Sequence, residues 1–298
     1  MARIAMTGSS GLIGTALARR LEGDGHEVLR MVRGSPGDAS AVWDPAAGWV
    51  REGALAGCDV VVNLGGASIG EGRWTASRKA ELRRSRIEAT RLLIDHLRTL
   101  KPPPRAFVSA SAVGYYGDRG DEVLVEESAA GDGFLAELVS DWEHEASRAA
   151  EVGCTTALVR LGVVIAGEGG ALSRMLLPFR LGVGGRLGNG RQWMSWITLE
   201  DAVGGLAHVI DEGLGGPLNV VAPGAVTNRE FTAALGRALR RPAFMPVPAV
   251  ALRMVFGEMA PEMLLASQRV AAGRLVASGY RFSQPEIEGA LAAALGKR

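Results

Sequence analysis

Residues 109–118, SASAVGYYGD, place two serines and two tyrosines between a strand-like run and an acidic turn. Hydroxyl groups at the end of a strand can orient a substrate oxygen and can transfer a proton to it. We take Ser111, Tyr115 and Tyr116 as candidate catalytic groups and Ser109 as a candidate cofactor contact. The alternative is a polar loop that closes a buried strand.

A second candidate site is the segment TGSSGLIG, whose glycines follow the spacing G-x-x-G-x-x-G between a strand and a helix. The first glycine permits a tight turn, the second lets backbone approach a phosphate, and the third lets the helix pack close to the strand. The N–H groups and dipole at the start of the helix favour a pyrophosphate. The segment predicts a dinucleotide site that comprises Gly8, Ser10, Gly11, Leu12, Ile13 and Gly14.

The end of the second strand indicates which dinucleotide binds. An acidic residue there would accept the ribose hydroxyls of NAD(H), but this chain has Val32 and Arg33. A cation at this place suits a 2′-phosphate, so NADP(H) is the predicted cofactor. The alternative is a solvated arginine at a strand end.

Composition restricts the class of protein. The chain has 298 residues, a net charge of +1 and no basic run, which disfavours nucleic acid or an anionic membrane as a partner. No apolar run is long enough to span a membrane, and the N-terminus does not resemble a secretory leader. The two cysteines suit a reducing cytoplasm, and the four histidines show no metal-ligand spacing. We expect a cytoplasmic protein with a small-molecule ligand and no structural metal.

Alternating strand and helix patterns predict the fold. The strand-like runs are 3–7, 26–33, 58–66, 105–111 and 155–164, and the helical runs include 77–100 and 134–151. Such alternation is typical of a Rossmann-type, doubly wound parallel sheet. We predict an NADP-binding core over residues 1–165 and a smaller, partly interleaved C-terminal α/β lobe over 166–298. A strand and helix near 199–223 are expected to return to the core.

Seven ordered segments, among them TGSSGLIG, SASAVGYYGD, FLAELVSDWE and RPAFMPVPAVALRMVFGEMA, make the chain resemble a known family. It resembles the YfcH-like epimerase family, atypical members of the extended short-chain dehydrogenase/reductases. The resemblance implies NADP binding, with the three glycines at the pyrophosphate and Val32 and Arg33 at the 2′-phosphate. It further implies that Leu64, Gly65, Glu81 and Arg86 reach the cofactor.

The resemblance also exposes a missing proton relay. Extended short-chain reductases carry Tyr-x-x-x-Lys at the start of the helix after the hydroxyl-rich loop, and here those positions are Phe134 and Leu138. No other Tyr-x-x-x-Lys exists in the chain. Three possibilities stay open. Tyr115 or Tyr116 replaces the tyrosine, a carboxylate acts as the base, or the protein binds cofactor without this chemistry. The candidate carboxylates are Glu137, Asp141 and Asp118.

The segment MSWITLED departs from the substrate motif of the extended epimerases as well. Met194 stands where an arginine would pair with a sugar-nucleotide diphosphate, and a thioether cannot neutralise a diphosphate. Gln192, Trp193 and Trp196 are the candidate substrate contacts, with ordinary packing as the alternative.

Two functions follow as hypotheses. One is an NADP(H)-dependent oxidoreductase or epimerase acting on a small, uncharged or weakly polar carbonyl or hydroxyl compound. The other is a catalytically weak or inactive NADP(H)-binding regulator or scaffold. The cationic face of helix 77–100 would repel its own copy, so we expect a monomer or a loose homodimer.

Overall fold

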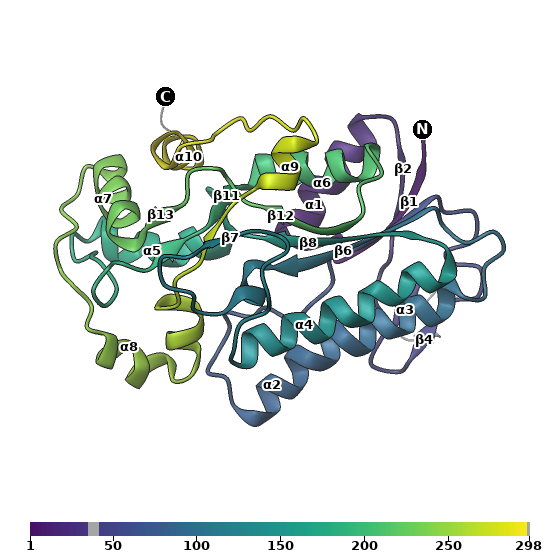
Figure 1. Cartoon of the computed structure of the whole chain (residues 1–298), viewed down its shortest axis with the longest axis horizontal. Helices are drawn as coiled ribbons and strands as arrows, with labels where there is room; N and C mark the ends of the chain where they lie inside the picture. The colour runs from purple at the N-terminus through teal and green to yellow at the C-terminus, as the bar shows by residue number, and fades with distance from the viewer. Residues whose placement is uncertain (35–41, 297–298) are drawn as a thin grey trace.

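Six parallel strands form the central sheet of the computed structural model, which describes residues 1–34 and 42–296. Their order across the sheet is β2-β1-β5-β6-β8-β12 (Figure 1). The bounds are β1 Arg3–Thr7, β2 Glu27–Arg30, β5 Val60–Asn63, β6 Ala106–Ala112, β8 Thr155–Leu161 and β12 Gly216–Val220. The predicted α/β class with a Rossmann-type sheet is confirmed.

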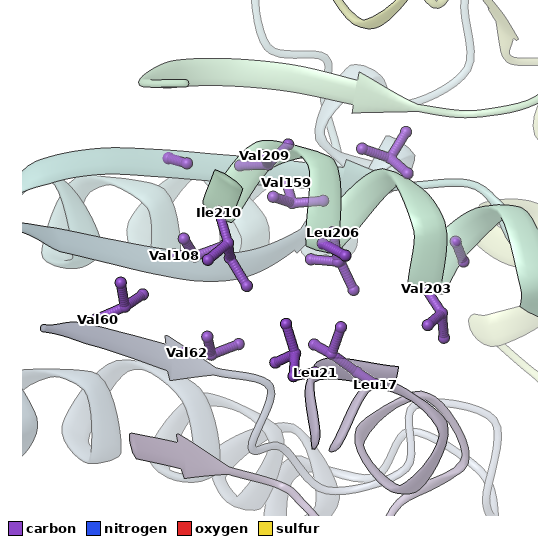
Figure 2. Packing of buried hydrophobic residues seen from close by; sticks show 14 of the residues in the cluster. Leu17, Leu21, Val60, Val62, Val108, Val159, Val203, Leu206, Val209 and Ile210 are labelled. Atoms are coloured by element: carbon purple, nitrogen blue, oxygen red, sulfur yellow. The ribbon is translucent and has the colours of Figure 1, made fainter. Parts of the chain in front are cut away.

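Helices cover both faces of this sheet. Helices α1 (Leu12–Gly23) and α6 (Leu199–Asp211) lie on one face, and α3 (Ala89–Leu97) and α4 (Phe134–Ser147) lie on the other (Figure 1). On the first face, Leu17 and Leu21 of α1 and residues of α6 pack against valines of the central strands (Figure 2). Because both faces are covered, the central strands are mostly buried and mainly apolar, as in the fully buried run of β5.

The strand order reverses its direction between β1 and β5, the kind of position at which doubly wound sheets form a ligand crevice. The chain leaves β1 toward β2 on one side, and it leaves the neighbouring β5 toward β6 on the other. Ligands of doubly wound sheets bind at such a switch point, outside the carboxyl ends of the strands. The glycine turn after β1 and the segment after β5 therefore meet at this crevice.

The helix expected over 77–100 is built in three parts. Helix α2 (Ala76–Arg83) is followed by a π-helical stretch, η1 (Arg84–Glu88), and then by α3. A π-helical turn changes the direction of the side chains that it carries, and such turns are frequent at functional sites.

The remaining elements fall into two groups, and most of those after β8 lie at the end of the molecule away from β2 and the N-terminus (Figure 1). In the core region they are β3 Trp43–Asp44, β4 Trp49–Val50, η2 Val113–Tyr116, β7 Val123–Leu124 and η3 Arg148–Val152. After β8 they are β9 Val163–Ile165, α5 Gly170–Arg180, β10 Trp193–Met194, β11 Trp196–Thr198, β13 Val226–Thr227, α7 Asn228–Leu239, α8 Ala249–Phe256, η4 Ala260–Leu264, β14 Arg269–Val270, α9 Gly273–Ala277 and α10 Ile287–Ala294. The segment α6–β12 lies in the core, where β12 pairs with β8.

Within residues 1–34 and 42–296, no helix has the length and apolar character needed to cross a membrane. In the same residues, no group of three or more His, Cys, Asp or Glu side chains is placed to hold a metal ion.

Gly14→Ala tests the packing of α1 on the glycine turn. A Cβ at this position would lie 2.1 Å from the Gly8 carbonyl oxygen, so the helix must shift. We expect a loss of about 1–3 kcal/mol in the free energy of unfolding, measured by urea denaturation.

Gly23→Ala is the matched control on the same helix. Its Cβ would meet no atom within 4 Å, and alanine is the better helix former, so stability should hold or rise. Equal stability changes for the two variants would contradict the packing role of Gly14.

Candidate dinucleotide site

The turn between β1 and α1 lies directly against the end of β5. Gly8 has a φ of +66°, and a Cβ there would lie 2.7 Å from the backbone carbon and oxygen of Leu64. The Thr7 hydroxyl donates to Asn63 Oδ1 at 2.8 Å and accepts the Gly65 N–H at 3.2 Å. These contacts hold the two loops together with no room for side chains between them.

Helix α1 begins without a cap of its own. Gly11 is the N-cap residue, no side chain caps the helix, and the first turn carries no acidic residue. The N–H groups at this end of α1 are thus not neutralised by a neighbouring carboxylate. Of the other residues predicted for the turn, Ser10 is exposed, Leu12 is at the surface, and Ile13 packs at the edge of the core. The cradle fits a pyrophosphate.

Val32 and Arg33 follow the end of β2 and are both exposed. The backbone of Arg33 forms a bridge to Trp43 of the short strand β3. Among the described residues, no carboxylate forms an ion pair with the Arg33 guanidinium. The cation is therefore available to an incoming phosphate.

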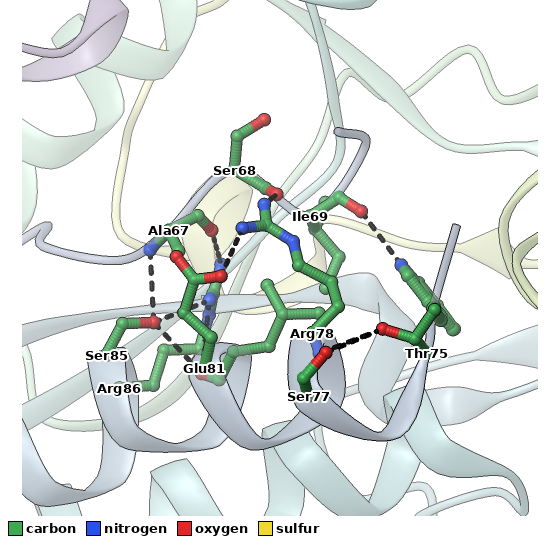
Figure 3. Close-up of polar contacts among 11 residues, drawn as sticks. Ala67, Ser68, Ile69, Thr75, Ser77, Arg78, Glu81, Ser85 and Arg86 are labelled. Atoms are coloured by element: carbon green, nitrogen blue, oxygen red, sulfur yellow. Dashed lines mark hydrogen bonds and ion pairs between the residues drawn. The ribbon is translucent and has the colours of Figure 1, made fainter. Parts of the chain in front are cut away.

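Arg86 lies beneath the loop that follows β5 (Figure 3). Its Nη2 donates to the Ala67 carbonyl at 3.0 Å, and its Nη1 makes longer contacts of 3.4 Å to the Leu82 carbonyl and the Ser85 hydroxyl. Burial, together with the nearby Arg78, lowers the pKa of Arg86 to about 10, so it stays charged at neutral pH. In the part of the chain that the structure describes, all its hydrogen-bond acceptors are neutral.

Glu81, also predicted at the cofactor, is an exposed residue that forms an ion pair with Arg78 at 2.7 Å (Figure 3). Arg78 additionally donates from Nη2 to the Ser68 carbonyl, whereas its buried Nε has no acceptor among the described residues. The side chains of α2 and η1 thus hold the backbone of residues 67 and 68 in place.

Ser111 is almost fully buried and is already hydrogen-bonded. Its hydroxyl donates to Glu143 Oε1 at 2.5 Å, and Glu143 accepts two hydrogen bonds of 2.8 Å from Arg160. Ser109 is also buried and donates to the Ala110 carbonyl at 3.2 Å. Ser111 therefore belongs to a buried ion-pair network that joins β6, α4 and β8.

The two adjacent tyrosines have different environments. Tyr116 is fully buried, and its hydroxyl accepts from Arg160 Nη1 at 2.9 Å and lies 2.7 Å from Asn219 Oδ1. Burial raises the pKa of Tyr116, which disfavours loss of its proton. Tyr115 is half-buried, with its ring stacked 3.6 Å from the Arg160 guanidinium carbon. Of the two, Tyr115 keeps an accessible surface, and its hydroxyl has no hydrogen-bond partner among the described residues.

An apolar cluster surrounds Phe134 and Leu138, the two positions at which the resemblance predicts a proton relay. Leu138 is fully buried with Trp74 and Met259, and the Phe134 ring lies 5.2 Å edge-on from Trp74. A carboxylate from the C-terminal segment lies at the start of the same helix, where Glu262 accepts the N–H groups of Phe134 and Leu135 at 3.2 and 2.6 Å. No tyrosine or lysine of α4 is available for proton transfer, because residues 134–147 contain neither.

The three carboxylates considered as a replacement base are all exposed. Asp141 forms an ion pair with Arg83, and Asp118 accepts the Ser267 N–H at 3.0 Å in a turn. Glu137 lies on the outer side of α4. Among the described residues, none of these three carboxylates forms a hydrogen bond with Ser111, Tyr115 or Tyr116.

The predicted substrate contacts are mostly structural. Trp196 is fully buried, and its indole N–H donates to the Gly224 carbonyl at 2.8 Å, which removes it from contact with a ligand in this conformation. Gln192 is buried and donates to the Leu187 and Leu264 carbonyls. Trp193 is half-buried. Its ring packs against the Arg269 guanidinium, and its indole N–H donates to Asp121 Oδ1. Of these three residues, Trp193 alone keeps an accessible surface.

The fold and the glycine turn define an extended short-chain dehydrogenase/reductase. The model of the NAD dependent epimerase/dehydratase family matches residues 4–221, and a domain of unknown function (DUF1731) matches residues 247–294. The chain therefore belongs to the NAD dependent epimerase/dehydratase family, in the branch that carries this C-terminal domain.

Relatives similar over nearly the whole chain support this assignment. Epimerase family protein ML0860 of Mycobacterium leprae is 44% identical over 97% of this chain and 94% of its own length. Human epimerase family protein SDR39U1 is 40% identical over 97% of this chain and 98% of its own length. The crystal structure of human SDR39U1 (isoform 2) with NADPH matches with a TM-score of 0.87, 37% identity and 99% coverage of both chains.

Three charged residues of this region, Glu143, Arg160 and Glu262, were not predicted from the sequence. A lone acidic or basic residue in a helix or strand is most often solvated, so nothing local marks it as part of a site. For Arg160 the sequence does contain a signal, because it stands at the centre of the apolar run TTALVRLGVV. A charge inside a buried strand requires a charged partner.

Arg160→Met tests the buried network. It leaves the Glu143 carboxylate buried without its cation, and we expect a loss of about 3–5 kcal/mol in the free energy of unfolding. Chemical denaturation measures this loss.

The double variant Arg160→Met with Glu143→Gln removes both charges and should recover a large part of the lost stability. A change below about 1 kcal/mol in Arg160→Met alone would show a solvated pair rather than a buried one.

Proposed function

We propose that this protein binds NADP(H) in the crevice between the glycine turn and the end of β5, and that it lacks the proton relay usual for its class. The observation that carries the proposal is the intact cradle beside a relay position filled by Phe134, Leu138 and Trp74. The protein then acts as an NADP(H)-binding regulator or scaffold with little hydride transfer.

Residues of this chain would hold the cofactor at three places. The start of α1, with Gly8, Gly11 and Gly14, binds the pyrophosphate through backbone N–H groups. Arg33 meets the 2′-phosphate at the end of β2, and Arg86 supplies a further cation under the loop after β5. Bound NADPH would supply a hydride from its nicotinamide ring.

Two observations support NADP(H) over NAD(H). Arg33 is an exposed cation, and no carboxylate pairs with it among the described residues. It lies at the end of the second strand, where dinucleotide-binding proteins of this fold contact the adenosine ribose. The human relative that shares 37% identity with this chain was crystallised with NADPH.

A second candidate function is an NADP(H)-dependent oxidoreductase or epimerase acting on a small carbonyl or hydroxyl compound. Tyr115 favours it, because this half-buried tyrosine stacks on Arg160 at 3.6 Å and its hydroxyl has no hydrogen bond with the rest of the described chain. The tyrosine would donate a proton from the loop instead of from α4. A sugar-nucleotide diphosphate does not fit, since Met194 replaces the arginine that would pair with it.

The charge pairs on α2, α3 and α4 support a monomer or a loose homodimer. Arg83, Arg91 and Arg98 form ion pairs with Asp141, Glu145 and Glu151 of the same chain, so this face does not need a twofold mate. Cys58 and Cys154 are free and buried, which fits the cytoplasm that we propose as its location.

Arg33→Asp tests the cofactor choice. The wild-type protein should bind NADP(H) roughly ten- to a hundredfold more tightly than NAD(H), since a charge-assisted contact contributes about 1.5–3 kcal/mol. The aspartate should remove this preference, because it repels the phosphate and can accept free ribose hydroxyls. Titration calorimetry with both cofactors measures the change.

Arg105→Asp, an exposed arginine directly before β6, is the control for the same change in net charge and should keep the preference. Equal wild-type affinities for the two cofactors would refute the role of Arg33.

Hydride transfer separates the two candidate functions. Purified protein with NADPH and a panel of carbonyl compounds should show turnover well below the range of about 1–10³ s⁻¹ typical of enzymes. Turnover within that range would contradict the regulator or scaffold proposal. Its loss in Tyr115→Phe, with NADPH binding intact, would then establish the tyrosine as the proton donor.

A further inference from the structure

Two segments of the C-terminal lobe carry arginines and no acidic residue. Residues 169–199 contain four arginines and residues 231–257 contain another four, whereas Asp and Glu are absent from both segments. Arg174 and Arg237 form ion pairs with Glu71 and Glu288. The others are exposed and pair with no carboxylate of the described residues; they are Arg180, Arg186, Arg191, Arg240, Arg241 and Arg253. The net charge of +1 for the whole chain conceals this local excess.

The same two segments expose large apolar side chains. Leu181 is 69% exposed, Phe244 is 72% exposed and Met254 is 67% exposed. Over residues 1–34 and 42–296, more than half of the exposed large apolar side chains lie in these segments, namely Leu177, Leu181, Val183, Phe244, Met245, Val250, Met254 and Val255. Apolar residues that are scattered singly over a surface need no explanation, but a contiguous patch marks an interaction site.

Backbone contacts bring the two segments together. Residues 182–187 run alongside residues 242–247, because Leu187 forms a parallel bridge to Val247 and the Val247 N–H donates to the Arg186 carbonyl at 2.9 Å. The end of α5 leads into the first of these runs, and α8 follows the second. Both helices lie at the end of the molecule away from the N-terminus (Figure 1). The exposed apolar side chains and the arginines therefore share one region of the surface.

Helix α8 is apolar on nearly every side. In its sequence AVALRMVF, Arg253 is the only polar residue, yet Leu252 is the only buried one. A helix that is apolar all round is ordinarily buried in a protein core or in a membrane. With eight residues, α8 is too short to span a bilayer and can only lie along its surface. We refer to residues 177–186 and 240–255 together as the basic apolar surface.

The charge of the basic apolar surface restricts what can cover it. A second copy of the chain in a twofold contact would place these arginines against the same arginines, which repel each other. Arginine together with Phe, Leu, Val and Met is instead typical of surfaces that enter a bilayer to a shallow depth. There the apolar side chains reach the acyl boundary, and the guanidinium groups meet anionic headgroups.

We propose that the basic apolar surface binds a membrane that contains anionic lipids, with α8 and residues 242–247 inserted at the headgroup boundary. The inference goes beyond the proposed function and does not depend on the cofactor site. It replaces the expectation that an anionic membrane is not a partner, which was based on the net charge of the whole chain.

Co-sedimentation of the 298-residue protein with unilamellar vesicles tests the proposal. One set of vesicles is phosphatidylcholine alone, and the other contains about 30% phosphatidylglycerol, which supplies the anionic headgroups. The wild type should bind the second set more tightly, and its binding should weaken as salt screens the charges. Arg253→Gln should weaken this binding about fivefold, about 1 kcal/mol. Arg105→Gln, an exposed arginine directly before β6, should leave it unchanged.

A second pair of variants tests the apolar contribution. Met254→Ser removes an exposed apolar side chain from α8 and should weaken binding to the anionic vesicles about tenfold or more. Val276→Ser makes a similar change on α9, outside the basic apolar surface, and should leave the binding unchanged. Should Met254→Ser fail to fold, as judged by circular dichroism, Phe244→Ser takes its place with the same expected loss.

The proposal is overturned if the wild type does not sediment with the anionic vesicles, if it sediments equally with both sets, or if Met254→Ser and Val276→Ser have equal effects. A dimer in light scattering that Met254→Ser dissociates would assign the surface to a second copy and would also overturn it. Binding to polyglutamate without binding to the vesicles would assign the surface to an acidic protein, with the same consequence.

Discussion

The contact between the glycine turn and the end of β5 is the constraint on which the rest of the site depends. Thr7 bonds Asn63 and Gly65, and Gly8 lies so close to Leu64 that any side chain would separate the strands. The Asn63 side-chain amide in turn donates to the Thr90 hydroxyl at 2.9 Å. The position of α1, and with it the pyrophosphate cradle, therefore follows from packing between neighbouring strand ends.

The start of α4 is apolar where the resemblance to short-chain reductases predicts a proton relay. Leu138 is buried in a cluster with Trp74, and Phe134 packs against the same cluster. The C-terminal segment adds Met259 to the cluster and Glu262 to the end of the helix. Under the proposed function, fold and chemistry are separable, because the scaffold would hold the cofactor without the usual tyrosine and lysine.

Local patterns in the sequence predicted the fold and the position of the glycine turn, because both depend on short-range rules. Glycine spacing between a strand and a helix determines the turn, and alternating apolar runs determine a doubly wound sheet. The catalytic candidates were harder, since Ser111 and Tyr116 acquire partners 32 and 103 residues away. A hydroxyl-rich segment gives no sign of whether its hydroxyls will face a crevice or satisfy a buried arginine.

A crystal structure of this chain with NADP⁺ tests the account most directly. The account predicts a pyrophosphate on the N–H groups at the start of α1, a 2′-phosphate at Arg33, and a nicotinamide with no side-chain proton donor from α4 within hydrogen-bond distance of its reacting face. A dinucleotide bound away from the glycine turn would contradict it. So would a rearranged α4 that brought an ionisable side chain, in place of Phe134, to the nicotinamide.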